Sequence, residues 1–416
     1  MPSSLTSARM SRLIPAASDR PSDDPIFALN AEAQRRAAEG EAVINATLGA
    51  LMENDGSLAV MPAVFEAYSK VDPQRAAAYA PIAGDVPFLN AVMDDVFGSS
   101  PMRARAEAVA TAGGTGALHH AIVNFLEPGE ELCTTNWYWS PYNIIAHHTG
   151  RGVRTFQMFD DSGSFDIGAF EACLRDQVAR QSRALVIFNF PCHNPTGYSL
   201  DDGEWAAMAE VMNSVGKEAP VAFVLDLAYA RYGASGKGHW TQFLEAMSHN
   251  CTLLVAWSAS KAYAQYGSRV GSLIVVPPTE EERAPMRNAL AYSCRGTWSN
   301  CNHLGILAIT ELLTDSDLKA RSDEERGRLR ELLDERVNAF NRAAEKETFK
   351  YPRYEGGFFV SVFVSDAPKV AEVAREEGVF VVPMKDAVRI ALCSTATQDV
   401  PRLVEVLGRA IVQVEN

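Results

Sequence analysis

Several features that mark common classes of protein are missing from this sequence. The seven cysteines include no Cys-x-x-Cys pair and the eight histidines show no His-Glu-x-x-His spacing, so neither a zinc site nor a disulfide framework is predicted. Basic residues number 38 against 52 acidic ones, which gives a net charge of −14. Nucleic acids and anionic membranes attract basic surfaces, so neither is expected as a partner. No apolar run approaches the length of a membrane span.

Residues 1–25 also lack a continuous apolar core, and are rich in Ser, Ala and Pro. We therefore expect no secretory signal there, but a flexible arm, or an arm that reaches a partner subunit. The scattered cysteines are expected to be reduced thiols. Together with the absence of a signal, they predict a cytoplasmic protein. A chain of 416 residues exceeds one core of ordinary size, so two domains are expected.

Short apolar runs alternate with helical patterns through the middle of the chain, which predicts βαβ units and a mostly parallel sheet. The expected strands are residues 107–111, 184–190, 221–225 and 252–257. The last three are predominantly apolar rather than alternating, as in strands that are covered on both faces. Ligands of such sheets bind beyond the carboxyl ends of the strands, so functional side chains are expected at those ends.

The pattern changes near Arg321. Residues 322–325 have the form of a capping box, which predicts the start of a long helix. Its expected apolar face comprises Leu329, Leu332, Leu333, Val337 and Phe340. A strand at 358–364, a helix at 370–377, two short strands and a C-terminal helix from about Val400 follow. We divide the chain into 1–60 (an N-terminal arm and part of a small domain), 61–320 (a large domain) and 321–416 (the small α+β domain).

Ser258-Ala259-Ser260-Lys261 follows one of the buried strands, with Arg269 eight residues further on. A lone lysine is usually a solvated surface charge. Within a small-residue turn after an apolar strand, however, a partly desolvated lysine has a lowered pKa and forms a Schiff base with an aldehyde. Serine hydroxyls and an arginine nearby suit a phosphate dianion.

Polar side chains follow two further strands. Asp226 either caps a turn or holds a protonated ring nitrogen in a site of low dielectric, and Tyr229 three residues later is then placed to hydrogen-bond a cofactor phenolate. Asn194, in His193-Asn194-Pro195-Thr196-Gly197, either marks a plain turn or donates to the same phenolate.

A glycine-rich turn at 113–116 joins the first strand to a helix expected at 117–125. Backbone N–H groups and the helix dipole bind phosphate at such a point. The turn matches neither a Walker loop, which needs Gly-Lys-Ser/Thr, nor a Gly-x-Gly-x-x-Gly fingerprint.

In this order the motifs resemble those of the class I aminotransferases of the pyridoxal-phosphate fold-type I superfamily, in their aspartate/aromatic branch. The likeness runs from Asp24 to the C-terminus, and the segments 193–197, 258–261 and 266–271 are its most specific parts. The resemblance implies an α/β fold: a large domain with a mostly parallel sheet of the seven-stranded type, and a smaller α+β domain. It also implies pyridoxal 5′-phosphate as cofactor.

The resemblance assigns roles around the cofactor. Lys261 is implied to be the Schiff-base lysine and the acid–base catalyst. Asp226 is implied to pair with the pyridine nitrogen, with Asn194 and Tyr229 on the phenolate oxygen. The implied phosphate-binding residues are Gly114, Thr115, Ser258, Ser260 and Arg269, with Trp139 stacked on the ring and Tyr79 reaching the phosphate from a neighbouring subunit.

Substrate contacts follow from the same resemblance. Arg389 is implied to bind the α-carboxylate in a bidentate fork, beside Gly49 and Asn194. Arg295 stands where the branch has an arginine for a distal carboxylate, supplied by the other subunit. An exposed loop arginine is the alternative, and Leu48 and Trp298 add apolar surface that suits aromatic substrates.

Two positions depart from the pattern. Gly113 stands where the branch usually has serine, so one phosphate donor is absent. Tyr142 stands where a histidine usually supports the aspartate that faces the ring. Neither departure touches the lysine.

The expected function is transfer of an amino group between an L-amino acid, aspartate or aromatic, and a 2-oxo acid such as 2-oxoglutarate, by a homodimer with shared sites. A lyase, decarboxylase or synthase on the same fold is the alternative, because fold alone does not fix the reaction. A regulator that borrows this fold would need an added DNA-binding domain, for which the match from Asp24 onwards leaves no room.

Overall fold

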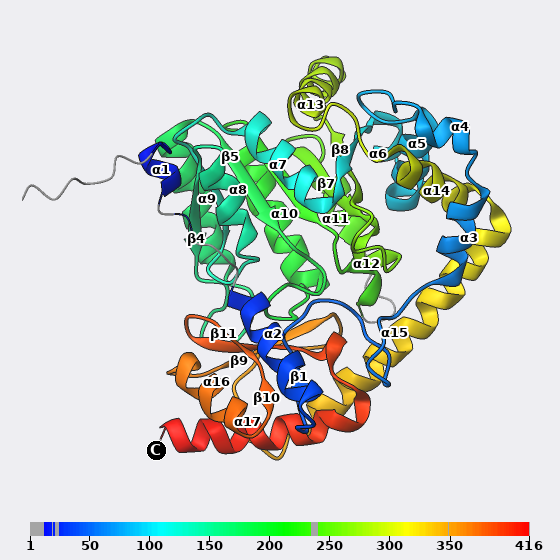
Figure 1. Cartoon of the computed structure of the whole chain (residues 1–416). Coiled ribbons are helices and arrows are strands. Elements are labelled where there is room, and N and C mark those ends of the chain that lie inside the picture. The colour runs from blue at the N-terminus through cyan, green and yellow to red at the C-terminus, as the bar shows by residue number, and fades with distance from the viewer. Residues whose placement is uncertain (1–11, 19, 21–24, 234–239, 348, 416) are drawn as a thin grey trace, which may run out of the picture.

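The computed structural model describes residues 12–18, 20, 25–233, 240–347 and 349–415. In Figure 1 a large sheet with helices on both sides forms one part of the molecule, and the C-terminal strands and helices gather at the opposite end. The long helix α15 (Ser316–Ala344) runs down one side and connects the two parts.

The central sheet has seven strands in the order β2-β8-β7-β6-β5-β3-β4. Neighbouring strands are parallel except at β8, which is antiparallel to both β2 and β7. The strands are β2 (Glu107–Ala112), β3 (Glu131–Thr135), β4 (Gly152–Phe156), β5 (Ala184–Phe188), β6 (Val221–Asp226), β7 (Thr252–Ser258) and β8 (Val270–Val276). Strands β5 to β8 are buried along their whole length. The predicted α/β class with a mostly parallel sheet is confirmed.

Helices cover both faces of the sheet, which explains the unbroken apolar runs. Helices α7, α8 and α13 pack on one face, and α5, α9, α10 and α11 contribute to the core on the other. The helices up to the end of the sheet are α1 (Pro15–Ser18), α2 (Pro25–Ala38), α3 (Pro62–Lys70), α4 (Pro73–Ala77), α5 (Val86–Phe97), α6 (Met102–Arg105), α7 (Gly113–Phe125), α8 (Pro141–His148), α9 (Ile167–Gln181), α10 (Asp202–Gly216), α11 (Trp240–Met247) and α12 (Ala259–Ala262). Two more, α13 (Arg283–Thr297) and α14 (His303–Thr314), precede α15, and a 3-10 turn covers Ala230–Tyr232.

Helix α7 begins earlier than the sequence predicts. The expected turn at 113–116 is instead the first turn of the helix, which starts at Gly113 directly after β2. Gly113 has a φ of +68°, which glycine adopts without strain, so one residue suffices to redirect the chain. A β-carbon on Gly271 would lie 2.5 Å from the carbonyl carbon of Gly113. Two facing glycines therefore bring the start of α7 against β8.

The predicted start of the long helix is wrong. Helix α15 begins at Ser316 rather than near Ser322, because the carboxylate of Asp315 accepts from the backbone N–H groups of Asp317 and Leu318. Ser322 lies inside the helix and is buried. The predicted apolar face is correct in Leu329, Leu333, Val337 and Phe340, which are buried, while Leu332 is half-buried. Because α15 crosses residue 320 without a break, the division of the chain at that point stays a prediction.

The C-terminal part has its own small sheet. Strand β12 (Ala387–Ala391) pairs antiparallel with β9 (Phe359–Phe363) and β11 (Val382–Pro383). The N-terminal strand β1 (Ile44–Asn45) pairs with β10 (Val379–Phe380), so residues far apart in the sequence share this part of the fold. Helices α16 (Ala367–Glu376) and α17 (Val400–Glu415) cover it, and 3-10 turns lie at Leu392–Ser394 and Thr397–Asp399.

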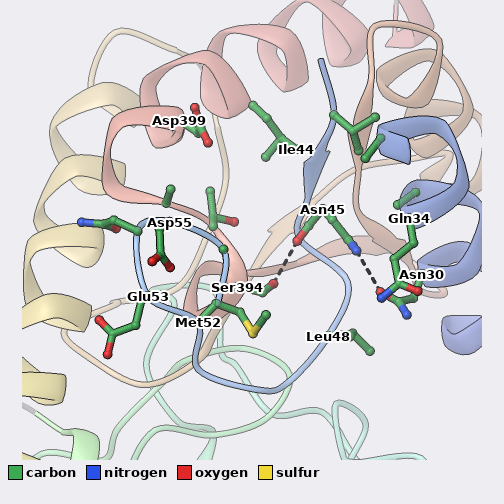
Figure 2. A pocket seen from close by; sticks show the side chains of 17 residues that line it. Asn30, Gln34, Ile44, Asn45, Leu48, Met52, Glu53, Asp55, Ser394 and Asp399 are labelled. Carbon is green, nitrogen blue, oxygen red and sulfur yellow. Dashed lines mark hydrogen bonds between the residues drawn. The ribbon is translucent and has the colours of Figure 1, made fainter. Parts of the chain in front are cut away.

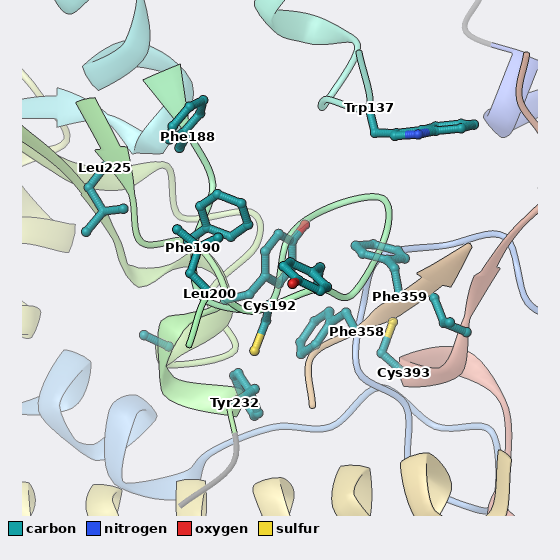
Figure 3. Close-up of a cluster of buried hydrophobic side chains, with 14 of the residues drawn as sticks. Trp137, Phe188, Phe190, Cys192, Leu200, Leu225, Tyr232, Phe358, Phe359 and Cys393 are labelled. Atoms are coloured by element: carbon teal, nitrogen blue, oxygen red, sulfur yellow. The ribbon is translucent and has the colours of Figure 1, made fainter. Parts of the chain in front are cut away.

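An apolar cluster joins the two parts next to the ends of the sheet strands. Figure 3 shows Phe358 and Phe359 between the loop after β5, which holds Phe190, and Cys393. The ring of Phe358 lies 5.0 Å from that of Tyr232, centroid to centroid. Aromatic pairs at such distances add to the apolar burial, so β9 is held firmly beside the carboxyl ends of β5 and β6.

Candidate active site

Polar side chains from four strand ends line one cavity of about 190 Å³. It lies beyond the carboxyl ends of the parallel strands, where sheets of this kind bind their ligands. Its lining comprises Gly114, Thr115, Leu118, Trp139, Asn189, Asn194, Asp226, Ala228, Tyr229, Ser258, Ser260, Lys261 and Arg269. All the residues that the sequence places around the cofactor within one subunit are therefore brought together here.

Lys261 enters the cavity from the short helix α12, which follows β7. The hydroxyl of Ser258 accepts from the Ser260 backbone N–H at 3.1 Å and caps this helix. The ammonium of Lys261 lies 5.4 Å from the centre of the Tyr229 ring. Burial lowers the pKa of Lys261, the nearby Asp226 carboxylate opposes this, and Arg269 lowers it further. A lysine in this environment has access to its neutral, nucleophilic form.

Asp226 lies at the end of β6 and is 5% exposed. Burial raises the pKa of Asp226, and the hydrogen bonds from Tyr142 and from the Ala228 backbone lower it. The Tyr142 hydroxyl donates to Oδ2 at 2.8 Å, and the Ala228 N–H donates to Oδ1 at 3.1 Å. The departure at Tyr142 thus gives the carboxylate a phenol donor. Together these donors hold an anion in a site of low dielectric, where a protonated ring nitrogen would complete the pair.

Asn194 and Tyr229 lie next to each other on the same side of the cavity, with the Asn194 side-chain amide donating to the Tyr229 hydroxyl at 3.3 Å. Asn189 positions this group and was missed from the sequence. Its side chain accepts from the Asn194 backbone N–H at 2.9 Å and donates to the Asp226 carbonyl at 2.8 Å. A signal was present, because an amide inside the apolar run 184–190 needs hydrogen-bond partners when buried.

The start of α7 and the loop after β7 form the opposite end of the cavity. Gly114 and Thr115 present the first turn of a helix, and Ser258, Ser260 and Arg269 line the space beside it. Arg269 Nη1 lies 3.5 Å from the Ser260 hydroxyl and donates to the Tyr266 carbonyl at 3.0 Å. Helix N–H groups with an arginine fork form an anion site.

A close contact with Arg269 explains why position 113 is a glycine. A β-carbon there would lie 2.6 Å from Nη2 of Arg269. Gly113 therefore leaves room for the Arg269 guanidinium. The hydroxyl donor of the usual serine is lost, but the arginine approaches this position closely.

Arg389 and Gly49 lie beside the cavity, on the C-terminal part of the fold. Arg389 is 8% exposed, donates to the Thr47 carbonyl at 2.9 Å, and places its guanidinium carbon 4.5 Å from the centre of the Phe359 ring. A β-carbon on Gly49 would lie 2.7 Å from that ring. Phe359 also packs 5.6 Å from the Tyr229 ring, so it connects Arg389 to the cavity. No motif in the sequence singles out Phe359.

Two predicted site residues do not reach the cavity of their own subunit. Tyr79 is 91% exposed, and Arg295 is exposed on α13, where its guanidinium donates to the Ser299 hydroxyl. Trp298 stacks on His120 with ring centroids 4.5 Å apart. Its indole therefore covers α7, rather than extending the apolar surface of this subunit's cavity.

A second cavity, of about 410 Å³, lies between α2, β1, the 48–56 loop and the 394–399 segment. Figure 2 shows Asn45 at the edge of this cavity, hydrogen-bonded to Asn30 and to Ser394. Glu53, Asp55 and Asp399 also lie around the cavity. No lysine, arginine or histidine is among the described residues that line it. A phosphate would be repelled there, so the cavity around Lys261 is the candidate site.

The residues around Lys261 fit a phosphorylated aldehyde with a basic ring. At one end of the cavity, the first turn of α7 and Arg269 suit a phosphate. The Lys261 amine suits the aldehyde, and the buried carboxylate of Asp226 suits the ring nitrogen. No group of three or more metal-ligating side chains occurs in the part of the chain that the structure describes. The fold and the cavity define an enzyme that works with an organic phosphate cofactor.

Known proteins with similar sequences and structures agree with this class. The model of the family "Aminotransferase class I and II" matches residues 44–407. An aspartate aminotransferase of Pseudomonas aeruginosa is 26% identical over 402 residues, which are 94% of this chain and 97% of that protein. An aromatic-amino-acid aminotransferase of Escherichia coli is 26% identical over 352 residues, covering 82% of this chain and 86% of that protein. A solved aminotransferase from Anaerococcus prevotii superposes with a TM-score of 0.92 at 30% identity, covering 97% of this chain and 100% of that one.

The chain therefore belongs to the aminotransferases of class I and II. It is a transaminase that moves an amino group between an amino acid and a 2-oxo acid, and its cofactor is pyridoxal 5′-phosphate. The predicted family, reaction class and cofactor are confirmed. No helix in the described ranges has the length and apolar character that crossing a bilayer requires.

Proposed function

We propose that Lys261 binds the cofactor aldehyde and moves the proton between the substrate and the cofactor. The observation that supports this most is the position of Lys261, which lines one cavity with Asp226, Arg269 and the first turn of α7. When bound, pyridoxal phosphate supplies an electron sink for the charge that forms at the substrate α-carbon. The lowered pKa of Lys261 suits its amine to take up and return that proton near neutral pH.

The remaining residues orient the two reactants. Asp226, supported by Tyr142, keeps the ring nitrogen protonated, and Asn194 with Tyr229 binds the ring oxygen. Trp139 lines the cavity and covers the ring. Gly114, Thr115, Ser258, Ser260 and Arg269 bind the phosphate. Arg389, anchored on Thr47 and stacked on Phe359, binds the α-carboxylate beside Gly49.

We also propose a homodimer in which each subunit completes the partner's site. Tyr79 is 91% exposed although it belongs to the motif set, and it is not among the described residues that line the cavity of its own subunit. Ile82, Val86 and Phe65 are apolar and exposed in the same region of the sequence. Apolar side chains grouped on a surface indicate an interface, and a symmetric dimer is the commonest arrangement. A cytoplasmic location is proposed as well, supported by seven free cysteines.

For the substrate we propose that one member of each pair is a dicarboxylate. Arg295 is exposed and does not line the cavity of its own subunit, which leaves it available to a partner. Its guanidinium donates to the Ser299 hydroxyl near the end of α13. The similar proteins include both aspartate and aromatic aminotransferases. An aromatic amino donor is the leading alternative for the other half of the reaction.

Replacing Arg295 by alanine is expected to lower kcat/KM for aspartate or 2-oxoglutarate while phenylalanine and tyrosine change far less. Loss of a buried charge pair costs about 2–5 kcal/mol of transition-state binding. That corresponds to roughly 30- to 5,000-fold. Steady-state kinetics with both substrate types measures it, and Arg287→Ala on the same helix, 50% exposed, is the control. Equal losses for both types, or none, would remove Arg295 from the site.

Replacing Tyr142 by phenylalanine is expected to move the acid limb of the kcat/KM profile to higher pH. The Tyr142 hydrogen bond lowers the pKa of Asp226 while burial raises it. Without the donor the pKa rises further, so protonation removes the carboxylate charge at a higher pH than before. A hydrogen bond to a charged group contributes about 1.5–3 kcal/mol, or about 1–2 pH units. Tyr142→His restores a donor and is expected to return the limb towards its original place, whereas an unshifted limb in Tyr142→Phe would contradict the proposed role.

The proposed reaction is tested by mixing the enzyme with single amino acids and following the absorbance of the bound cofactor. A transaminase converts its cofactor to the amine form and releases one equivalent of 2-oxo acid, and added 2-oxoglutarate restores the starting spectrum. Release of carbon dioxide, or of a product without change of the cofactor, would favour a decarboxylase or lyase on the same fold.

A further inference from the structure

His303, the first residue of α14, contacts both ends of the segment that bears Tyr79. Its Nδ1 lies 2.7 Å from the Ala78 carbonyl oxygen, directly before Tyr79, and its Nε2 lies 3.1 Å from Oδ2 of Asp85. One imidazole therefore bridges the entry and the exit of residues 78–85. The His303 and Asp85 side chains are only 11% and 12% exposed.

Both partners of His303 are hydrogen-bond acceptors. A neutral imidazole has one N–H, whereas the imidazolium has two, so only the charged ring donates to the Ala78 carbonyl and the Asp85 carboxylate together. Asp85 is the N-cap residue of α5, yet its side chain caps no backbone N–H. An aspartate at an N-cap normally accepts from the helix backbone. Here the carboxylate instead faces His303 and Arg75, whose Nη2 is 3.5 Å away.

The carboxylate of Asp85 is the acidic group that contacts His303. Arg75, from α4, contacts the same carboxylate but is 61% exposed. The next charged side chain along α14 is Glu311, two turns further. At the C-terminal end of the segment the Ala83 carbonyl accepts from the Ala110 N–H of β2 at 2.7 Å. The half that bears Tyr79 is joined to α14 through His303.

We propose that His303, as an imidazolium, is a positioning residue that sets the direction in which Tyr79 reaches the cofactor phosphate of a second copy of this chain. The proposal rests on the proposed role of Tyr79. When the ring loses its second proton, one of the two contacts is lost and the phosphate is bound less tightly.

The test is the dissociation constant of pyridoxal phosphate, measured by titrating the apoenzyme at about pH 6 and about pH 8.5. Glutamine keeps one amide donor, as the neutral ring does. His303→Gln is therefore expected to weaken binding roughly five- to tenfold at the lower pH, and by less than about twofold at the higher pH. Comparing variant with parent at one pH cancels the ionisation of the cofactor and of Lys261. His249→Gln, an exposed histidine, is the control and is expected to bind as the parent at both pH values.

Repeating the measurement in the Tyr79→Phe variant distinguishes a failure of the His303 proposal from a failure of the proposed role of Tyr79. In Tyr79→Phe the additional effect of His303→Gln is expected to disappear, because the histidine acts through that tyrosine. Equal weakening by His303→Gln at both pH values, or none at either, overturns the His303 proposal alone. If Tyr79→Phe itself binds the cofactor as tightly as the parent, the proposed role of Tyr79 fails and the role of His303 fails with it.

Discussion

Lys261→Ala is expected to abolish turnover, lowering kcat by about 10⁴-fold or more, the upper end of what a positioned acid–base group contributes. The reason is that the amine of Lys261 is proposed both to bind the cofactor and to move the proton at the substrate α-carbon. Its environment supports this, because burial and Arg269 lower its pKa while Asp226 opposes them. Single-turnover absorbance measures the loss.

The matched control is Lys385→Ala. The Lys385 side chain is 91% exposed, and its removal is expected to leave kcat within about twofold, since substitutions at the surface are usually near neutral. A Lys261→Ala variant that keeps a tenth of the parent's rate would contradict the assignment. Added small amines offer a second readout: partial recovery of turnover would show that the missing group is an amine and not a structural support.

Asp226→Ala is expected to slow removal of the α-proton while cofactor binding is retained. Breaking a buried charge pair by removing one partner typically costs about 3–5 kcal/mol, which is roughly 150- to 5,000-fold in rate. The Asp226 carboxylate is buried and accepts hydrogen bonds from Tyr142 and the Ala228 N–H. Solvent is therefore not expected to compensate for the loss of its charge. Rapid mixing with an amino acid measures this step separately from product release.

Asp226→Asn separates charge from shape, since the amide has the same size but no charge. We expect it to be nearly as slow as Asp226→Ala. If the asparagine variant runs within tenfold of the parent in single-turnover kinetics, the ring nitrogen does not depend on the Asp226 charge. In that case Asp226 is a structural residue that anchors the loop after β6.

The strand ends were predictable from the sequence because the sheet is buried on both faces. Apolar runs marked β5, β6 and β7. Polar residues at the ends of β6 and β7, Asp226 and Ser258, and Asn194 in the loop after β5 were singled out, and all three line the cavity. The family resemblance then supplied the roles of these residues. Strand β5 ends at Phe188 rather than 190, since Asn189 leaves the ladder to bond with the Asn194 backbone and the Asp226 carbonyl.

Other features depend on contacts between distant parts of the chain. Tyr142 and Asp226 are 84 residues apart in the sequence. The sequence marked Tyr142 only as a departure from the family pattern, so its hydrogen bond to Asp226 was not predicted. Phe359 is one of many buried aromatics, and only the fold places it under Arg389. The start of α15 was misplaced because a local capping pattern at Ser322 competes with a real cap at Asp315.

The measurement that tests the central claim most directly is chemical trapping of the cofactor. The native enzyme is reduced with borohydride, digested, and the labelled peptide is identified by mass spectrometry. A lysine bound to an aldehyde is fixed by reduction, so the label is predicted on Lys261 alone, within the peptide that contains Ser258 and Ser260. Label on any other lysine, or none with fully loaded enzyme, would contradict the account of this site.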